Sequence, residues 1–191
     1  MKLVVATNNR HKLEEIQQFL GTDFQLLTLQ DIDCTEELPE TGSTIEANSL
    51  EKTKYLADYY NVDCFGDDTG LEVEALNNEP GVDSAFYSGN RDAVANMQKV
   101  LDGLTGNTQR NARFRTVITL IIKGEIYQFE GKVTGTILEA PRGEKGFGYD
   151  PIFVPDGYTQ TFAELSLAEK NKISHRTRAI TKMVEFLTTP G

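Results

Sequence analysis

The chain has 191 residues, 39% of them hydrophobic and 25% charged, which is typical of a single globular domain with a sizeable core and excludes a disordered chain. Its 29 acidic residues outnumber its 19 lysines and arginines, and the formal net charge of −10 argues against a nucleic-acid polymer or an anionic membrane as partner. Cys34 and Cys64 form no disulfide framework, and no apolar stretch has the length of a signal peptide or membrane span, so we expect reduced thiols and a cytoplasmic protein.

The first predicted elements are a strand at residues 3–6 and a helix with Leu13, Ile16 and Leu20 on one face. Between them lies the segment Thr7-Asn8-Asn9-Arg10-His11-Lys12. The N–H groups of a helix N-terminus, the helix dipole and the Lys12 amine would together bind a phosphate. A plain capping turn explains the segment equally well, because the glycine-rich phosphate-loop motif is absent. The residues alone leave both interpretations open.

A second helix is predicted to begin at Ser43, because Ser43 and Glu46 have the spacing of a capping box, and to continue to Tyr60. Lys52 lies on this helix. A lysine on a helix face is more often solvated than functional, so Lys52 alone is a weak candidate for a site.

The segment Phe65-Gly66-Asp67-Asp68-Thr69-Gly70-Leu71 is the strongest local signal for a metal. Successive side chains of a strand point to opposite faces, so Asp67 and Asp68 address one site only if the strand ends there. We therefore expect a strand to end at these residues, with one aspartate serving a metal and the other holding the turn. A plain Asx-type turn is the alternative. Magnesium requires oxygen ligands and takes one or two carboxylates, and Glu40 is a candidate neighbour.

The later elements alternate turns, strands and helices. A strand is expected at residues 71–75, with turns at 77–78 and 80–81, and a helix after Asp92 with Val94, Met97 and Leu101 on one face. A long antiparallel pair of strands follows at 112–122 and 126–138. The last helix is capped by Ser174 and has an apolar stripe of Ile180, Met183, Val184 and Leu187. This order predicts an α/β fold with a mixed sheet.

Two further segments suggest ligand contacts. In Gly146-Phe147-Gly148-Tyr149-Asp150-Pro151 the glycines let the backbone approach a ligand and leave the Phe147 ring free to stack on a flat base. In Ser174-His175-Arg176 cations lie at the start of a helix, where the dipole disfavours them, so an anionic or acceptor-rich group is expected nearby. A packed aromatic ring and a capping histidine are the alternatives.

Taken together, five segments closely resemble the inosine triphosphate pyrophosphatase family, also called dITP/XTP pyrophosphatases. They are Thr7-Asn8-Asn9-x-x-Lys12, Asp67-Asp68-Thr69-Gly70-Leu71, Pro80-Gly81-Val82-x-Ser84-Ala85, Gly146-Phe147-Gly148-Tyr149-Asp150-Pro151 and Ser174-His175-Arg176. The resemblance implies magnesium-dependent hydrolysis of non-canonical purine nucleoside triphosphates (ITP, dITP, XTP) to the monophosphate and pyrophosphate. It also implies an elongated two-lobed α/β fold around a long mixed β-sheet with flanking helices and a cleft between the lobes, in one domain over residues 1–191, and a homodimer.

The family roles carry over by position. The triphosphate-binding loop of the family is matched by Thr7, Asn8, Asn9, Arg10, His11 and Lys12, and Lys52 resembles a phosphate lysine. Asp68 resembles the catalytic acid that also meets magnesium, and Thr69 resembles a substrate contact. The base-binding segment is matched by Phe147, Gly148, Tyr149 and Asp150, and the remaining substrate contacts by Lys170, His175 and Arg176.

The chain departs from the family pattern where many members have Glu-Glu-Thr-Gly followed by Glu-Asn-Ala. Here the residues are Pro39-Glu40-Thr41-Gly42 and Ala47-Asn48-Ser49. The second acidic metal ligand is therefore either Glu40, which we rank first, or Glu46. Thr69 replaces the commoner serine and keeps its hydroxyl.

The resemblance leads to a mechanistic hypothesis. Asp68 binds magnesium and activates water, Lys12 and Lys52 hold phosphates, and Phe147 stacks on the base. Arg176 or a backbone N–H faces the 6-carbonyl that inosine and xanthosine carry and adenosine lacks, which explains rejection of ATP but not of GTP. Three alternatives are a purine nucleotide sensor without turnover, a pyrophosphatase for modified pyrimidines, and, more remotely, a glycosidase, whose two carboxylates must bracket a bond as adjacent acids cannot.

Overall fold

The computed structural model describes residues 1–20 and 24–189. The chain divides into two compact units, one of residues 1–68, 116–131 and 176–191 and the other of residues 69–115 and 132–175. Its strands form one mixed sheet in the order β2 (Gln25–Leu27), β1 (Lys2–Val5), β3 (Cys64–Val73), β5 (Asn111–Ile122), β6 (Glu125–Ile137) and β7 (Phe153–Pro155), with β4 (Glu79–Pro80) paired to β3. The expected α/β fold with a mixed sheet is confirmed. Within the described ranges no helix has the length and apolarity to cross a membrane.

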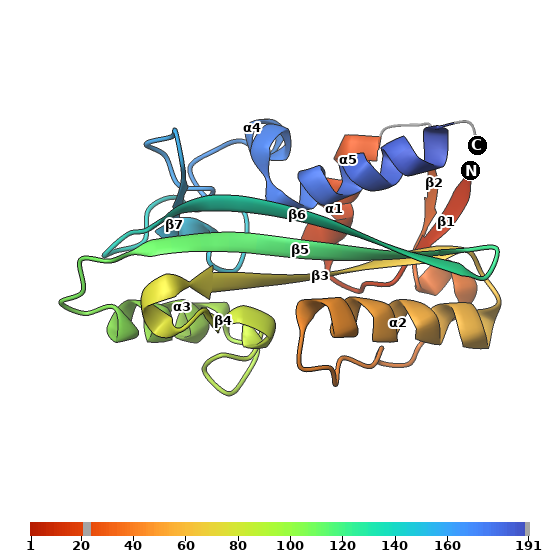
Figure 1. Ribbon diagram of the computed structural model, residues 1–191, viewed down its shortest axis with the longest axis horizontal. Coiled ribbons are helices and arrows are strands. Elements are labelled where there is room, and N and C mark those ends of the chain that lie inside the picture. The colour runs from red at the N-terminus through yellow and green to blue at the C-terminus, as the bar shows by residue number, and fades with distance from the viewer. Residues whose placement is uncertain (21–23, 190–191) are drawn as a thin grey trace. The chain divides into compact units, whose positions relative to one another are not determined.

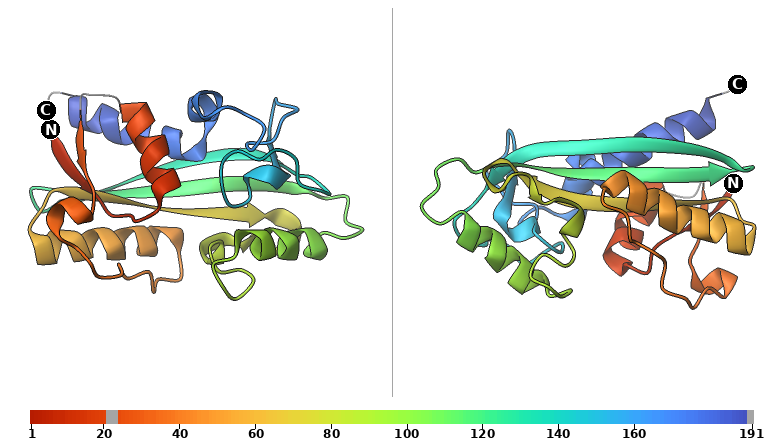
Figure 2. Two further views of the ribbon diagram at one scale, coloured as in Figure 1. Left: turned by 180° about the vertical axis from the view of Figure 1, so that it is seen from behind. Right: turned by 60° about the horizontal axis from the view of Figure 1, so that its bottom comes forward.

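The first unit packs helices on both faces of its strands (Figure 1). Its elements are β1 (Lys2–Val5), α1 (Arg10–Leu20), β2 (Gln25–Leu27), a 3₁₀ helix (Gln30–Ile32), α2 (Ile45–Tyr60) and α5 (His175–Thr188). One core cluster joins Ile16 of α1 and Ile180 of α5 to Leu120 of β5, and another joins Leu56 of α2 to Ile121. Because Leu120 and Ile121 are successive strand residues, the two clusters cover opposite faces. Figure 2 shows α1 and α5 side by side from behind.

The second unit has its own core around Phe114, whose ring packs edge-on against Phe153 at 4.7 Å and is stacked with Phe162 at 5.9 Å. Its elements are β4 (Glu79–Pro80), α3 (Ala93–Gly103), β7 (Phe153–Pro155), α4 (Leu167–Ile173) and 3₁₀ helices at Glu74–Leu76, Gly81–Asp83 and Asp150–Ile152. Three strands contribute residues to both units, namely β3 (Cys64–Val73), β5 (Asn111–Ile122) and β6 (Glu125–Ile137). Cys34 and Cys64 are buried free thiols, as expected.

The largest departure from the sequence-based expectations is strand β3. It runs without interruption from Cys64 to Val73, so the predicted strand end and turn at Asp67-Asp68 are wrong. Parallel pairing of Val5 with Phe65 precedes the acidic pair, and antiparallel pairing of Glu72 with Pro80 follows it. Pairing of β3 before and after the acidic pair, together with its neighbour β5 in the sheet, therefore keeps the polar segment extended, against its local turn preference.

The other differences are smaller. Thr44, not Ser43, caps α2 by accepting the Ala47 N–H at 3.1 Å, so the helix begins one residue later than the predicted capping box requires. Val94 is 70% exposed, and Val100 and Leu104 fill the core beside α3 instead. The predicted stripe of α5 is confirmed, with Ile180 and Met183 buried.

Candidate active site

The loop before α1 is closed by its own side chains. Thr7 Oγ1 accepts the Asn9 N–H at 3.1 Å, and Asn9 Oδ1 accepts the N–H groups of His11 at 3.1 Å and Lys12 at 3.3 Å. Asn9 therefore caps α1, and the capping interpretation is confirmed for this turn. Among the predicted loop residues, Asn8, Asn9, Arg10 and His11 are exposed.

Lys12 turns inward to a buried ion network around Asp67. Its amine lies 3.1 Å from Asp67 Oδ2 and 3.3 Å from the Asp67 carbonyl. The Arg176 guanidinium donates to the same Oδ2 at 3.1 Å and also binds Glu15 of α1. Asp67 and Arg176 are 0% and 1% exposed, so this network is desolvated and its charges depend on one another.

Asp68, the next residue on β3, has a different set of neighbours. Its Oδ1 lies 3.8 Å from Lys52 Nζ, and the same amine lies 2.5 Å from Glu40 Oε1. Strand alternation explains why adjacent aspartates reach different partners. Gly66 allows α2 to bring Lys52 this close, because a Cβ at Gly66 would lie 2.5 Å from Thr53 Oγ1 and 2.9 Å from Ala6 Cβ.

The two aspartates have pKa values that shift in opposite directions. Burial raises the pKa of Asp68, and the charge of Glu40 adds to this effect although Lys52 opposes it. Burial also acts to raise the pKa of Asp67, but Lys12 and the neighbouring guanidinium outweigh it and hold that pKa well below its usual range. Asp67 is therefore a fixed anion, whereas Asp68 is a poised carboxylate of the kind that acts as a general base.

The two lysines also differ. Burial lowers the pKa of the Lys12 amine, with only partial compensation by Asp67. Burial acts in the same direction on Lys52, but Asp68 and Glu40 outweigh it and raise the pKa of that amine. Lys52 is thus held as a cation between two carboxylates.

The residues around Asp68 fit a divalent cation. Asp68 Oδ2 is buried and has no hydrogen-bond partner among the residues that the structure describes. A buried carboxylate oxygen without a donor is costly, and a hard cation would satisfy it. Glu40 is close enough to raise the pKa of Asp68 by its charge. No group of three or more His, Cys, Asp and Glu side chains suited to a metal occurs in the described part of the chain, so waters and substrate phosphates would complete the shell.

A second group of predicted site residues lies in the second unit, around the half-buried Phe147. Asp150 Oδ2 accepts the Phe147 N–H at 2.9 Å and the Lys170 amine at 2.7 Å. That amine also lies 5.0 Å from the centre of the Phe147 ring. Gly146 and Gly148 have φ values of +73° and +60°, so the segment requires its glycines, as the sequence suggested.

Two residues of this group have partners that the sequence did not indicate. The His175 ring is buried and lies parallel to Phe114, with 4.7 Å between ring centres. Tyr149 is buried, and its hydroxyl donates to the Ser84 carbonyl at 2.7 Å. Both side chains therefore lie within the core of the second unit, and Tyr149 fixes the segment to Ser84. Thr69, half-buried, directly follows Asp68 on β3.

Sequence reasoning missed Glu15 and Ser84. Glu15 lies three residues after Lys12 in α1 and next to the apolar Ile16, so its place on the buried helix face was a usable signal. Ser84 belongs to the Pro80-Gly81-Val82-x-Ser84-Ala85 segment, which resembled the family but received no role.

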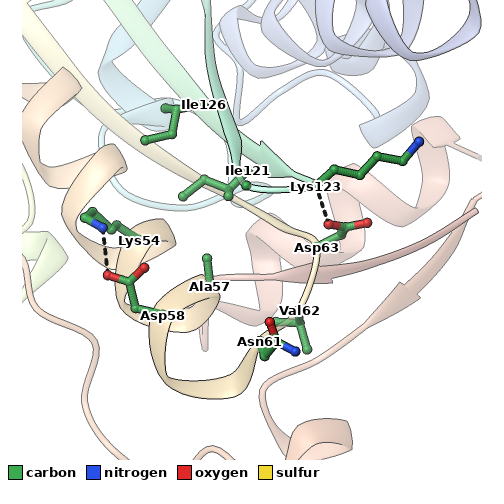
Figure 3. Close-up of a pocket in the computed structure, with 10 residues that line it drawn as sticks. Lys54, Ala57, Asp58, Asn61, Val62, Asp63, Ile121, Lys123 and Ile126 are labelled. Carbon is green, nitrogen blue, oxygen red and sulfur yellow. Dashed lines mark hydrogen bonds and ion pairs between the residues drawn. The ribbon is translucent and has the colours of Figure 1, made fainter.

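A pocket of about 250 Å³ lies elsewhere in the first unit, lined by Lys54, Ala57, Asp58, Asn61, Val62, Asp63, Ile121, Lys123, Gly124 and Ile126 (Figure 3). It contains none of the predicted site residues. Lys54 and Asp58 form an exposed ion pair at its edge, 2.7 Å apart, and Asp63 accepts the Lys123 N–H at 2.8 Å.

Comparison with known proteins gives a consistent result over the whole chain. The sequence model of the Ham1 family matches residues 3–186. The dITP/XTP pyrophosphatase of Flavobacterium johnsoniae is 50% identical over 189 residues, covering 98% of both chains, and that of Bacillus subtilis is 43% identical, covering 96% of both. Among solved structures, the Ham1 protein of Staphylococcus aureus is 38% identical with a TM-score of 0.89, and that of Coxiella burnetii is 35% identical with a TM-score of 0.90; both comparisons cover 98% of each chain.

Proposed function

The chain belongs to the Ham1 family, and we propose that it hydrolyses the non-canonical purine nucleoside triphosphates ITP, dITP and XTP to the monophosphate and pyrophosphate, which removes them from the nucleotide pool. It is a hydrolase of nucleoside triphosphates. The observation that carries the proposal is Asp68, a buried carboxylate with a raised pKa next to Glu40 and Lys52.

Asp68 has the properties of the general base. A raised pKa lets a carboxylate accept a proton from water more readily than an ordinary aspartate does. In the proposed reaction the proton moves to Asp68, the water oxygen bonds to the α-phosphorus, the bond from that phosphorus to the bridging oxygen breaks, and pyrophosphate leaves. Lys12 and Lys52 bind the phosphates and balance the charge on the leaving group.

We further propose Mg²⁺ as the cation that Asp68 and Glu40 would hold. When bound, it would neutralise phosphate charge and so lower the barrier to attack. The unpartnered Asp68 Oδ2 supports this assignment. Glu40→Gln should therefore raise the magnesium concentration needed for half-maximal turnover and weaken Mn²⁺ binding measured by calorimetry.

The base is proposed to stack on Phe147, which is held by Asp150 and accompanied by Lys170. For the 6-carbonyl, Arg176 remains the proposed donor, and the carboxylates of Glu15 and Asp67 fix its guanidinium rigidly. An amino group at position 6 would then face a donor, so adenine would be rejected. Arg176→Lys keeps a cation for both carboxylates, and a retained preference for ITP over ATP in this variant would contradict the assignment.

The central test is pyrophosphate release from ITP, XTP, GTP and ATP at equal concentration, with magnesium and with chelator. We expect magnesium-dependent release from ITP and XTP only. ITP binding without release from any nucleotide would instead favour a nucleotide sensor, and Asp68→Asn supplies the matched inactive control.

A homodimer in the cytoplasm is also proposed. Light scattering coupled to size-exclusion chromatography at micromolar concentration would give about twice the 21.3 kDa chain mass for a dimer. A mass equal to one chain would contradict it.

A further inference from the structure

Ser84 forms hydrogen bonds with residues of three separate segments of the second unit. Its Oγ accepts the Leu71 N–H at 2.9 Å and donates to the Gly81 carbonyl at 2.6 Å. Its own carbonyl accepts the Tyr149 hydroxyl at 2.7 Å. One buried serine therefore connects strand β3, the turn after β4 and the aromatic segment, all within the second unit.

The connection to β3 replaces a missing strand partner. β4 pairs with β3 only through Glu79 and Pro80, and Gly81, with a φ of +54°, turns the chain away. The buried Leu71 N–H lies just beyond this ladder, and the Ser84 hydroxyl accepts it. The hydroxyl thus fixes the turn to the strand that carries Thr69 two residues earlier.

The hydrogen bond from the Tyr149 hydroxyl to the Ser84 carbonyl fixes the segment of residues 146–151, which carries Phe147. Phe147 lies between two glycines with positive φ. Because glycine restricts the backbone little, the local chain alone does not fix the orientation of the Phe147 ring. The Asp150 carboxylate holds the Phe147 N–H, and the Ser84 carbonyl holds the Tyr149 hydroxyl. Tyr149 and Asp150, the two residues that follow Gly148, therefore restrain the position of Phe147.

We propose that Ser84 is a positioning residue for base recognition: its hydroxyl fixes the 81–84 turn, and through Tyr149 this turn holds Phe147 in the orientation that stacks on the purine. The inference rests on the proposed function, because it assigns Phe147 to the base. It gives a physical role to the Pro80–Ala85 segment. The hydrogen bonds of Ser84 go to Leu71, Gly81 and Tyr149, and not to the lysines proposed to bind the phosphates, in the part of the chain that the structure describes.

The test compares ligands with and without a base. In Ser84→Ala, the inhibition constant for IMP should rise about tenfold, which is a partial loss of one stacking contact. The inhibition constant for inorganic tripolyphosphate should stay within about twofold, because only the base contact is weakened. Ser84→Thr, which keeps the hydroxyl, should bind IMP like the wild type. Equal weakening of both ligands, or unchanged IMP inhibition, would overturn the proposal.

A double-mutant cycle tests whether Ser84 acts through Tyr149. Tyr149→Phe alone should weaken IMP by a similar factor, and adding Ser84→Ala should weaken it little further. Full multiplication of the two effects would refute the path through Tyr149. Tyr149→Phe leaves the Leu71 hydrogen bond intact, so it carries the ligand comparison if Ser84→Ala does not fold.

Thr161→Val is the matched control. Thr161 is another buried hydroxyl of the second unit that donates to a carbonyl, that of Arg142, and accepts an N–H, that of Glu164. It should lose stability and keep both inhibition constants. If the wild type releases no pyrophosphate from ITP, the proposed function fails; calorimetric IMP binding by wild type and Ser84→Ala then still decides the role of Ser84.

Discussion

Asp67 and Asp68 show how two identical neighbouring side chains acquire different chemistry. Asp67 contacts Lys12 and Arg176, and these cations keep it ionised. Asp68 lies 3.8 Å from the Lys52 amine, and burial outweighs the attraction of the nearby lysines, so its charged form is disfavoured. The first aspartate is held as an anion by its ion pairs, and the second is the proposed general base.

Substituting each aspartate by asparagine should separate these roles. Asp68→Asn should lower turnover by about 10²–10⁴-fold, the usual contribution of a general base. Its stability at pH 7 should equal or exceed that of the wild type, because a raised folded-state pKa means that folding disfavours the charge removed. Turnover and chemical denaturation of the same preparation measure both effects.

Asp67→Asn should do the opposite to stability. It leaves Arg176 and Lys12 buried without their shared carboxylate, and breaking a buried ion pair costs about 3–5 kcal/mol. A stable Asp67→Asn variant together with a destabilised Asp68→Asn variant would contradict the division of roles.

The Lys52 amine would compete with a metal ion for the carboxylates of Glu40 and Asp68. Its amine lies 2.5 Å from Glu40 and 3.8 Å from Asp68. Lys52→Met should therefore tighten Mn²⁺ binding about tenfold, because a competing cation is removed, while turnover should fall because the proposed contact to a substrate phosphate is lost. Calorimetry without nucleotide gives the affinity, and Lys54→Met, an exposed lysine of the same helix, is the control. Weaker Mn²⁺ binding in Lys52→Met would count against this competition.

At the scale of elements, the sequence predicted those with strong periodicity. The α5 stripe, the α1 face and the hairpin at Lys123-Gly124 follow from spacing and turn chemistry alone. The sequence failed where tertiary pairing overrides local preference. β3 stays extended through Asp67-Asp68-Thr69-Gly70 because β1 and β4 pair with it on either side of these residues. The three-residue β2 and the seven-residue α4 are too short to give a periodic signal.

The same reasoning explains what could be predicted of the site. Lys12, Asp68 and Phe147 could be proposed from the sequence, because Lys12 stands at a helix start, Asp68 in an acidic pair before a glycine, and Phe147 between two glycines. The bonds of Glu15 to Arg176 and of Ser84 to Tyr149 could not be predicted, because hydrogen bonds over large sequence separations do not identify their partners in the local sequence.

Helix α4 carries Lys170 and depends on its cap. Ser166 Oγ accepts the Glu169 N–H at 3.2 Å, and the Glu169 carboxylate accepts the Ser166 N–H at 2.9 Å, which completes a capping box. Ser166→Ala should lower the free energy of unfolding by about 1 kcal/mol. Urea denaturation measures it, and an unchanged midpoint would show that tertiary packing alone holds the helix.

The carboxylate of this box also predicts a pH dependence. Hydrogen bonds from Ser166 lower the pKa of Glu169 below its ordinary value. A depressed folded-state pKa adds stability above the unfolded pKa, and this contribution disappears as the pH falls through the folded value. Glu169→Gln should therefore lose stability relative to the wild type near pH 7 and match it more closely near pH 3. A difference that grows toward acid pH would have the wrong sign.

At the scale of the whole molecule, the chain passes between its two units inside strands rather than through linkers. The passages at 68/69, 115/116 and 131/132 fall within β3, β5 and β6, and that at 175/176 falls at the start of α5. Domains that unfold independently are usually joined by exposed flexible linkers. A strand cannot lose its order in one half without weakening the hydrogen bonds of the next residues.

We therefore expect one cooperative unfolding transition, which matches the expectation of a single domain over residues 1–191. Leu120 and Leu104 are fully buried leucines of the first and second unit, and Leu120→Ala or Leu104→Ala should each cost about 2–5 kcal/mol. Each substitution should shift the same single transition and speed hydrogen exchange in β6 on both sides of residue 131, because exchange of core amides then requires global opening. Two transitions, with each variant moving only the one assigned to its own unit, would show instead that the shared strands do not couple them.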